Sequence, residues 1–519
     1  MPSISFGFGK PIPGPLNKMR IEKKKLELII IAAVILIAVF FRFWQIRDYV
    51  VFLGDEGRDM LVMRNMILEK RPVFLGPTAS VGGFYLGPIY YWMAAPFLAL
   101  WRFDPVGPSV MVATFGVATV VLLYKFLREV AGFWPATLAS LLYAIAPLIV
   151  RYSRSSWNPN PLPFFALLQI YSVYLAITRK KPLLFLVSGL CFGVAIQLHY
   201  LAISLIPISI AIIVLNSNFK SWPKAIALTF IGAFITFSPF LIFEARHGFP
   251  NFHTILEFVT RKTTHGYQSP NIIWVISNFG NILLEDIAKF SGTILTKVAF
   301  WSLSFGSIFI LAKNWQNEKK RLIGSICVIW FLGGLAVLRF YSGQIFDYYF
   351  GFMFPAPFFA FGVVVGEYWQ KNTFKLIFIS FTIFASVLFL NRGFWQSPPN
   401  RLINQTQTIA DYVIQKSQGE PFNFALMSDH NSDHAYRYFL EIRGAKPVQL
   451  ETMVTDQLLI VCESKKCSPL GYPSWEVAGF GRGEVNDQWE LPNFGIRIFR
   501  LTHWAGAPNP AGKPAVKEQ

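Results

Sequence analysis

The chain has 519 residues, of which 53% are hydrophobic, 17% aromatic and 15% charged, and its mean hydropathy is +0.43. This composition excludes a soluble protein of this size and predicts a polytopic membrane protein. The formal net charge of +18 does not indicate nucleic acid, because Lys and Arg fall in short clusters between apolar runs, as orientation in a membrane requires. We therefore expect membrane lipid, and no nucleic acid, among its partners.

The first apolar run, residues 28–46, is long enough to span a bilayer and lacks a small-residue cleavage site, which predicts a signal anchor. Residues 1–27 carry Lys23, Lys24 and Lys25, and this basic cluster predicts a cytoplasmic N-terminus. The following segment, 47–108, is then an outer loop.

This outer loop contains two predicted helices. Apolar residues recur at helical spacing from Met60 to Ile67, opposite polar ones, which predicts an amphipathic helix in the membrane interface. The run 88–101 is short and contains Pro88 and Pro96, so we expect a juxtamembrane or re-entrant helix there. A span at this place would invert the orientation of every later segment.

Ten further apolar runs alternate across the membrane, giving about eleven transmembrane helices in a domain over residues 28–392. Every lysine-rich turn then falls inside, and a long outer loop extends over 244–291. The ten runs are residues 109–127, 135–150, 162–177, 183–198, 203–215, 225–243, 292–312, 322–338, 350–365 and 376–391.

The composition changes after Arg392, where Ser397-Pro398-Pro399-Asn400 is typical of a linker. Residues 400–504 alternate helix and strand patterns and predict a small soluble α/β domain on the outer side. We expect a disordered tail over 505–519, which is rich in Pro, Ala and Gly. Within the domain the patterns predict helices over 402–415 and 434–442 and strands over 422–427, 458–462 and 496–501.

The four cysteines fall into two pairs of different character. Cys462 and Cys467 are five residues apart in the outer domain, close enough for a small disulfide loop in an oxidising compartment, although spacing alone leaves open whether they are bonded. Cys191 and Cys327 fall within spans and are expected to be inert core thiols. No cysteine–histidine spacing resembles a zinc site.

Polar residues gather at the turns predicted to face outward. Arginines are usually more frequent in cytoplasmic turns than in outer ones, so arginines at outer turns need an explanation. Binding of a phosphate at the level of the lipid headgroups is one, since guanidinium groups match phosphate oxygens. A single arginine of this kind is also explained by a lipid-headgroup contact, and His199 by an interfacial anchor. The set includes Asp55, Glu56, Arg58, Arg154, Trp157, Asn158, His199, Tyr200, Arg339 and Asp347.

The order of these features resembles a known family. An acidic pair, Asp55-Glu56, follows the first span, Arg58 comes just after it, and the run Gly87-Pro88-Ile89-Tyr90-Tyr91-Trp92 follows the interfacial helix. This arrangement is similar to the GT-C glycosyltransferases, and within them to the protein O-mannosyltransferases and the lipid A aminoarabinose transferase of glycosyltransferase family 39. The resemblance covers most of the membrane portion and is weakest in the soluble domain.

The resemblance implies a GT-C-like fold and an inverting transferase that takes a sugar from a polyprenyl-phosphate donor. It makes Asp55 the counterpart of the family's catalytic aspartate, which we interpret as the base. The predicted topology places this site, like the C-terminal domain, on the extracytoplasmic face of the plasma membrane. The acceptor is a protein, lipid or glycan. Around this base we expect loop or acceptor contacts from Glu56 and Asp347, donor-phosphate contacts from Arg58, Arg154, His199 and Arg339, and a substrate lining of Tyr90, Trp157, Asn158 and Tyr200.

The sequence also departs from the family pattern at two positions. Gly87 stands where many members carry a basic residue or His before the proline, so donor-phosphate contacts are expected elsewhere. Asn158 stands at the second acidic position, which weakens the case for a bound divalent metal. We expect no cofactor and leave the metal open.

Three alternatives remain at this point. Asp55 and Glu56 can simply solvate a helix end. Prolines within predicted spans also suit a transporter or lipid-linked sugar flippase, although no internal repeat is found and the charged groups gather at one membrane face. A non-catalytic membrane scaffold explains the spans but not the acidic pair or the arginines. The sequence does not name the sugar or the acceptor.

Overall fold

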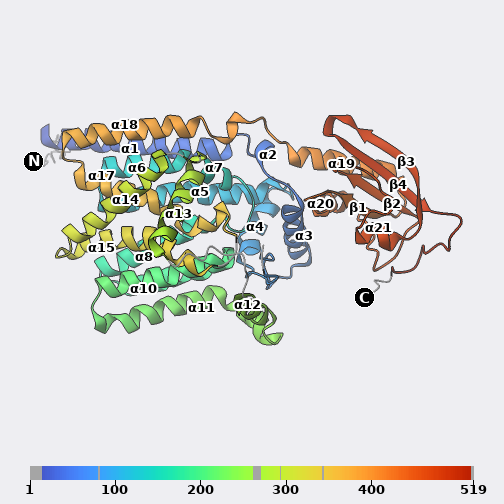
Figure 1. The fold of residues 1–519 in the computed structure, drawn as a ribbon, viewed down its shortest axis with the longest axis horizontal. Helices are drawn as coiled ribbons and strands as arrows, with labels where there is room; N and C mark the ends of the chain where they lie inside the picture. Colours follow the sequence, from blue (N-terminus) through green and yellow to red (C-terminus); the bar gives the residue numbers. More distant parts are fainter. Residues whose placement is uncertain are drawn as a thin grey trace, which may run out of the picture.

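The computed structural model describes residues 15–79, 82–260, 271–290, 292, 294–341 and 344–515. A bundle of long helices forms most of the molecule, and a small domain built on a four-stranded sheet lies beyond one end of it (Figure 1). The described chain begins at the opposite end of the bundle from this domain. Parts of the predicted N-terminal segment, outer loop and tail (1–14, 261–270 and 516–519) lie outside the described residues.

Each apolar run predicted from the sequence lies on a helix or a pair of helical segments of the bundle. Their bounds are α1 (Pro15–Phe43), α5 (Val106–Val130), α6 (Phe133–Ile145), α7 (Pro147–Tyr152), α8 (Leu162–Thr178), α9 (Leu183–Leu198), α10 (Leu205–Asn216), α11 (Trp222–Arg246), α14 (Ile294–Lys313), α15 (Glu318–Ile326) with η3 (Cys327–Gly333) and α16 (Gly334–Val337), η5 (Asp347–Met353) with α17 (Ala356–Tyr368), and α18 (Asn372–Leu390).

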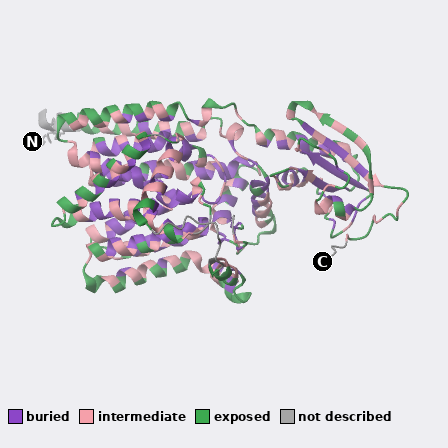
Figure 2. Cartoon of the chain, in the orientation of Figure 1, coloured by how far each residue is buried: buried purple, intermediate pink, exposed green. Residues whose placement is uncertain are grey.

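Six helical stretches in the described part of the chain are long and apolar enough to cross a membrane, or seven if the bent pair η5–α17 counts as one span. The outer faces of α11 and α18 are largely exposed (Figure 2), and they present apolar groups such as Phe234 and Phe384, 62% and 52% exposed. Such faces are stable against lipid and not against water. The chain is therefore a multi-pass membrane protein, and the count of eleven spans stays a prediction.

The predicted loop over 244–291 is wrong as a description of this segment. It contains α12 (Pro250–Thr260) and α13 (Ile272–Ala288). Helix α13 starts where the side chain of Asn271 accepts hydrogen bonds from two backbone amides, and it packs against α7, α14 and α16. Its buried positions Val275, Phe279 and Leu283 are four residues apart. That spacing gives one apolar face, which is the pattern of a helix.

The two helices predicted in the outer loop are present as α3 (Gly54–Glu69) and α4 (Ile89–Leu100). Helix α4 packs between α3 and α5, and its Tyr90 and Tyr91 are buried. Helix α3 lies between the end of the bundle and the C-terminal domain (Figure 1) and buries one face that includes Met60 and Met63. This position makes α3 the junction of the two parts.

The C-terminal domain follows α18 through η6 (Phe394–Gln396) and has a mixed sheet in the order β1-β2-β4-β3. Strands β1 and β2 are parallel, and β4 is antiparallel to both of its neighbours. The predicted helices and strands are present within a few residues. The elements are α19 (Leu402–Ser417), β1 (Asn423–Met427), α20 (His434–Ile442), β2 (Gln457–Cys462), α21 (Trp475–Phe480), β3 (Gly483–Leu491) and β4 (Ile496–His503).

Strand β3 and helix α21 were not predicted. Strand β3 is an edge strand whose side chains are mostly exposed or half-buried, so it lacks the apolar run of an inner strand. The tail also differs from the expected disorder as far as residue 515. Its backbone pairs with the segment before β2, where Val454 donates to Lys513, Gly512 donates to Val454 and Ala515 donates to Leu450. Cys462 and Cys467 form a disulfide.

We predict that a membrane-impermeant maleimide added to intact cells labels Gln418→Cys in the C-terminal domain but neither Lys180→Cys nor Lys320→Cys. All three positions are exposed in the structure, so access is decided by the side of the membrane. The lysine-rich turns are expected inside. Labelling of Lys180→Cys from the outside would overturn the predicted topology.

The wild-type protein is the control for this experiment. Its free cysteines, Cys191 and Cys327, are buried, and Cys462 is bonded to Cys467. Unmodified protein is therefore expected to give no label without denaturation.

Candidate active site

Two cavities meet at Asp55, which lies in the first turn of α3. The large cavity has a volume of about 970 Å³ and the small cavity about 300 Å³. Asp55, Trp157 and Tyr348 line both of them. The side chain of Asp55 is 67% exposed, so its carboxylate faces open space at the junction.

Each cavity has its own set of polar side chains. The large cavity is bounded by the end of α7, the linker after α18 and a loop of the C-terminal domain, and the small cavity by the end of α9 and the loop before α4. In the large cavity the charged and polar residues include Glu56, Arg151, Arg154, Asp347, Asp429, His430, Asn431 and Ser432, and in the small one Arg58, Asn158, His199 and Tyr200.

Arg58 joins two carboxylates on one face of α3. Its Nη1 lies 3.1 Å from Oδ1 of Asp55, and its Nη2 lies 2.9 Å from Oδ1 of Asp59. Residues three and four apart are neighbours on a helix surface, which explains how Asp55 and Arg58 come to pair. The guanidinium is therefore held in place beside the Asp55 carboxylate.

Asp59 was not predicted as a site residue, although it ends the same acidic stretch. Its side chain is 2% exposed, and Oδ1 also accepts a hydrogen bond from the hydroxyl of Tyr91 at 2.8 Å. Burial raises the pKa of Asp59 to about 6, against the opposing charge of Arg58. Its position four residues after Asp55 was the signal that places both carboxylates on one helix face.

Glu56 is bonded to the backbone at the start of the helix. Its Oε2 accepts a hydrogen bond from the backbone amide of Leu53 at 3.0 Å, as in a capping box. The residue is buried, and this burial raises the pKa of Glu56 to about 7. Glu56 thus bonds to the residue before the helix, and a loop or acceptor contact for it stays a prediction.

His199 lies buried in the wall of the small cavity. Its Nδ1 accepts a hydrogen bond from the Leu201 amide at 3.2 Å, and burial lowers the pKa of His199 to about 3. Its ring stacks on Tyr200 with a centroid distance of 4.6 Å. The imidazole is therefore neutral, with its proton on Nε2, and it offers a donor to a ligand but no charge.

Arg154 lines the large cavity, but its guanidinium is already bonded. Nη1 and Nη2 donate to the carbonyl oxygens of Phe41 and Trp44 at the end of α1, at 2.6 and 2.7 Å. The group also lies 3.9 Å from the ring centre of Phe394. These contacts cap a helix C-terminus, which is a structural role for the cation. Arg151, by contrast, is exposed in the large cavity and forms no ion pair within the described part of the chain.

Asp347 also lines the large cavity, and its carboxylate is paired. It accepts hydrogen bonds from the hydroxyl of Tyr152 and from the Tyr348 amide, and its Oδ2 lies 3.2 Å from Nζ of Lys289. Lys289 directly follows α13. Because the sequence predicted a loop in this segment, it gave no reason to expect Lys289 beside Asp347. Asn158 is fixed too, since its Nδ2 donates to the Leu198 carbonyl at 2.7 Å.

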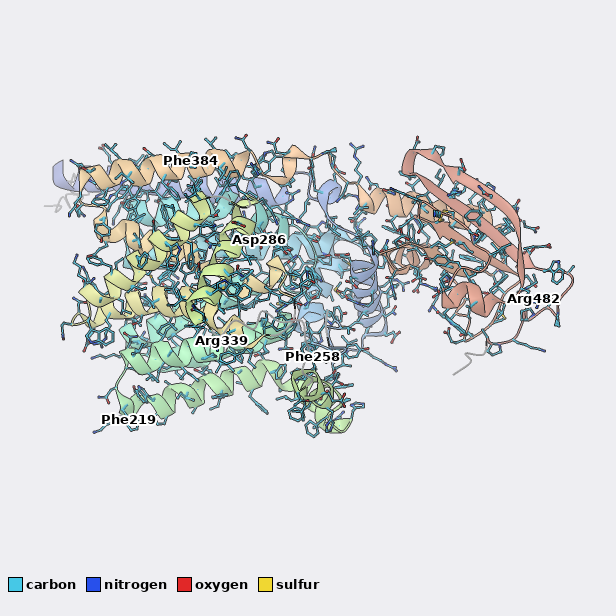
Figure 3. The ribbon with its side chains drawn as sticks, in the orientation of Figure 1. Phe219, Phe258, Asp286, Arg339, Phe384 and Arg482 are labelled. Atoms are coloured by element: carbon cyan, nitrogen blue, oxygen red, sulfur yellow. A yellow bond between two sulfur atoms is a disulfide. The ribbon has the colours of Figure 1, made fainter. Side chains whose placement is uncertain are left out.

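Two predicted site residues are not brought to these cavities. Tyr90 is fully buried beside Tyr91 and lines neither cavity, so it is not substrate-lining in this structure. Arg339 is exposed and lies among the bundle helices, as Figure 3 shows, and it likewise lines neither cavity. No group of three or more His, Cys, Asp or Glu side chains among the residues described is arranged to hold a metal ion.

Comparison with known sequences gives partial matches. A family model described as "Dolichyl-phosphate-mannose-protein mannosyltransferase" matches residues 86–243. An uncharacterized protein of Aquifex aeolicus (strain VF5) is 27% identical over 176 residues, and this match covers 33% of this chain and 34% of that protein. The chain thus spans about a third of the length of this relative.

Comparison with solved structures covers nearly the whole chain. ArnT from Cupriavidus metallidurans in the apo state has a TM-score of 0.58 at 12% identity, over 92% of this chain and 98% of that chain. The same protein bound to undecaprenyl phosphate has a TM-score of 0.56 at 13% identity, over 91% and 97%. An Archaeoglobus fulgidus oligosaccharyltransferase has a TM-score of 0.51 at 14% identity, over 83% and 67%. These likenesses confirm the predicted fold, a GT-C-like helical membrane protein with a small C-terminal domain.

We predict that Glu56→Gln changes the pH dependence of stability. A carboxyl whose folded pKa is raised gives stability that is complete below its unfolded pKa, near 4.5, and is lost as the pH rises through about 7. Glutamine keeps an oxygen for the Leu53 amide and does not ionise. The variant should therefore gain in thermal midpoint relative to the wild type between pH 5 and pH 8, as measured by scanning fluorimetry in detergent.

Glu69→Gln is the matched control, because Glu69 is exposed at the other end of α3. It should follow the wild-type curve at every pH. A Glu56→Gln midpoint that stays parallel to the wild type across this range would contradict the raised pKa.

Proposed function

We propose that this chain, whose fold is that of the GT-C glycosyltransferases, is an inverting glycosyltransferase on the extracytoplasmic face of the plasma membrane. It takes a sugar from a polyprenyl-phosphate donor and gives it to a protein, lipid or glycan. The observation that carries the proposal is the position of Asp55, an exposed carboxylate where two cavities meet. Proteins of one fold can catalyse different reactions, so the proposed reaction is argued from the residues of the site.

The two cavities suit two substrates. Arg58 lines the small cavity and not the large one, so we assign the donor phosphate to the small cavity. The Nε2 proton of His199 is a second donor there. The large cavity, which reaches the C-terminal domain, then receives the acceptor. The ArnT structure that holds undecaprenyl phosphate supports a donor of this class.

The chemistry needs one base and a stabilised leaving group. Asp55 accepts a proton from the acceptor nucleophile, which attacks the anomeric carbon from the side opposite the phosphate. The bond between the anomeric carbon and the phosphate oxygen breaks, and polyprenyl phosphate leaves with its charge stabilised by Arg58. A single displacement of this kind inverts the anomeric centre. A glycosidase would need a second carboxyl as the acid for a poor leaving group.

The structure changes which cations we assign to phosphate binding. Arg154 caps α1 and Arg339 lines neither cavity, so neither is kept as a phosphate contact. Arg58 and His199 are kept. In the large cavity the exposed Arg151 is available to an anionic group of the acceptor.

A transporter or lipid-linked sugar flippase is the alternative function. Such proteins bind substrate near the middle of the membrane. Here both cavities gather around α3, between the end of the bundle and the C-terminal domain (Figure 1), which favours transfer to an acceptor outside.

We predict that Asp55→Asn lowers kcat by about 10²–10⁴-fold, the range typical of a lost general base. Asparagine keeps the size and hydrogen bonding of the side chain, so the thermal midpoint and donor binding should stay close to the wild type. The measurement is the release of polyprenyl phosphate by purified protein with a verified donor.

Glu56→Gln is the matched control for this prediction, since Glu56 is adjacent but bonded to the Leu53 amide. It should cost less activity than Asp55→Asn. If Asp55→Asn kept near wild-type turnover, the assignment of the base would be wrong, and Glu56 or Asp347 would have to be tested.

A further inference from the structure

The C-terminal domain touches the helix that carries Asp55 at two glycines. A Cβ atom on Gly54 would lie 1.9 Å from Oγ of Ser432, and one on Gly57 would lie 2.3 Å from the backbone nitrogen of Ala435. Both distances are far below van der Waals contact. The start of α3 and the start of α20 therefore approach at backbone distance, and only glycine at these positions allows it.

One amide at the start of α3 is capped by this other domain. The backbone N–H of Gly54 donates to Oδ1 of Asn431 at 2.9 Å, across a sequence separation of 377 residues. The preceding amide, Leu53, is capped locally by Glu56. The first amides of a helix have no partner within the helix, so a side chain that accepts from them fixes where the helix begins. Asp55 is the next residue after Gly54.

Asn431 is itself held by a carboxylate. Its Nδ2 lies 3.2 Å from each carboxylate oxygen of Glu463, and the hydroxyl of Tyr436 donates to Oε1 of Glu463 at 2.7 Å. The amide of Asn431 is thereby oriented with its oxygen toward Gly54.

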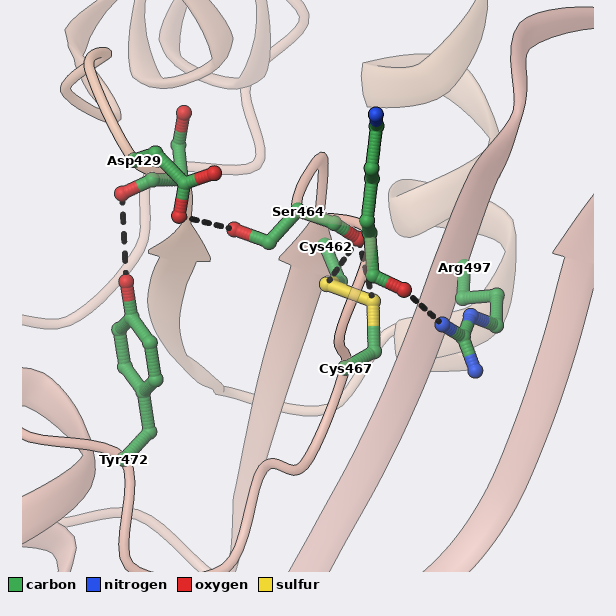
Figure 4. The surroundings of a disulfide bond; sticks show 8 residues. Asp429, Cys462, Ser464, Cys467, Tyr472 and Arg497 are labelled. Atoms are coloured by element: carbon green, nitrogen blue, oxygen red, sulfur yellow. Dashed lines mark hydrogen bonds between the residues drawn. A yellow bond between two sulfur atoms is a disulfide. The ribbon is translucent and has the colours of Figure 1, made fainter.

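Glu463 belongs to the loop closed by the disulfide between Cys462 and Cys467. In the same loop, Ser464 donates to Oδ1 of Asp429 at 3.1 Å, as Figure 4 shows. Both ends of the segment 429–431 are thus fastened to this loop, and the segment forms part of the wall of the large cavity.

We propose that Asn431 is a positioning residue for Asp55, and that Glu463 in the disulfide loop holds Asn431 in the orientation this requires. The C-terminal domain then completes the active site by fixing the helix start that carries the base. This inference rests on the proposed function of Asp55. Displacing a catalytic group by about 1 Å can slow a reaction on the order of 10²-fold. Loss of the hydrogen bond from Gly54 to Asn431 should therefore lower kcat and leave the affinity for the sugar donor unchanged.

The test reverses the hydrogen bond between Asn431 and Glu463, so that the amide and the carboxylate change places. Asn431→Asp alone places two carboxylates against each other and should lower kcat by about tenfold or more with the donor KM little changed. Adding Glu463→Gln supplies a side-chain amide that donates a hydrogen bond to the aspartate introduced at position 431. That aspartate still accepts a hydrogen bond from the backbone N–H of Gly54. The introduced glutamine oxygen still accepts from the Tyr436 hydroxyl. The double variant should therefore regain most of the wild-type kcat.

Two further readouts separate positioning from simple loss of fold. Hydrogen exchange of the peptide containing Gly54 should be faster in Asn431→Ala and near wild type in the double variant. In an Asp55→Asn background, Asn431→Ala should cause no further loss, because it acts through Asp55. Arg443→Ala, which removes an exposed ion pair with Asp411 in the same domain, is the control and should leave both readouts unchanged.

The inference is overturned if Asn431→Ala keeps full kcat, if it lowers activity equally in the Asp55→Asn background, or if the double variant is no better than Asn431→Asp. These failures are distinct from failure of the proposed function, which would appear as normal turnover by Asp55→Asn itself.

Discussion

The ion pairs that Arg58 makes along α3 are the interaction on which the site depends. Asp59 is buried, and a buried carboxylate is unfavourable unless it is paired and hydrogen-bonded. Arg58 and Tyr91 supply those partners, so α3 is fastened to α4 and through it to the bundle. Removing one partner of such a pair typically costs about 3–5 kcal/mol. The same guanidinium lies against Asp55, whose carboxylate remains exposed. One arginine thus fixes the helix and places a positive charge beside the carboxylate that we propose as the base.

The junction between the two parts of the molecule follows from the position of α3. One side of this helix is bound to the bundle through Asp59 and Tyr91, and its first turns contact α20 through Gly54 and Gly57. The large cavity is bounded by both parts, and the small cavity mainly by the bundle. A donor with a long lipid chain and an acceptor from outside the membrane would therefore reach Asp55 from different parts of the structure.

The sequence predicted those features that depend on local periodicity. The apolar runs, the part of α3 from Met60 to Ile67, and α20 all follow from spacing within one element. Helix α13 carried the same kind of signal, but it stood inside a segment expected to be a loop.

What the sequence did not predict depends on contacts between distant residues. The guanidinium of Arg154 meets carbonyls more than a hundred residues earlier, and the amide of Asn431 meets Gly54 across 377 residues. The neutral state of His199 follows from burial, which a sequence does not show at a predicted outward turn. Arg339 follows an apolar run at a predicted outward turn, but whether such a residue lines a cavity depends on how distant segments pack, and Arg339 lines neither cavity.

The most direct test of the central claim is to incubate the purified protein in detergent with a panel of polyprenyl-phosphate sugars and candidate acceptors, and to measure release of polyprenyl phosphate. The account predicts that at least one donor is consumed, that the product has the opposite anomeric configuration, and that Asp55→Asn slows this consumption by about 10²–10⁴-fold. If no donor is consumed while reconstituted protein moves a lipid-linked sugar across vesicles, the protein is a transporter and the account is wrong.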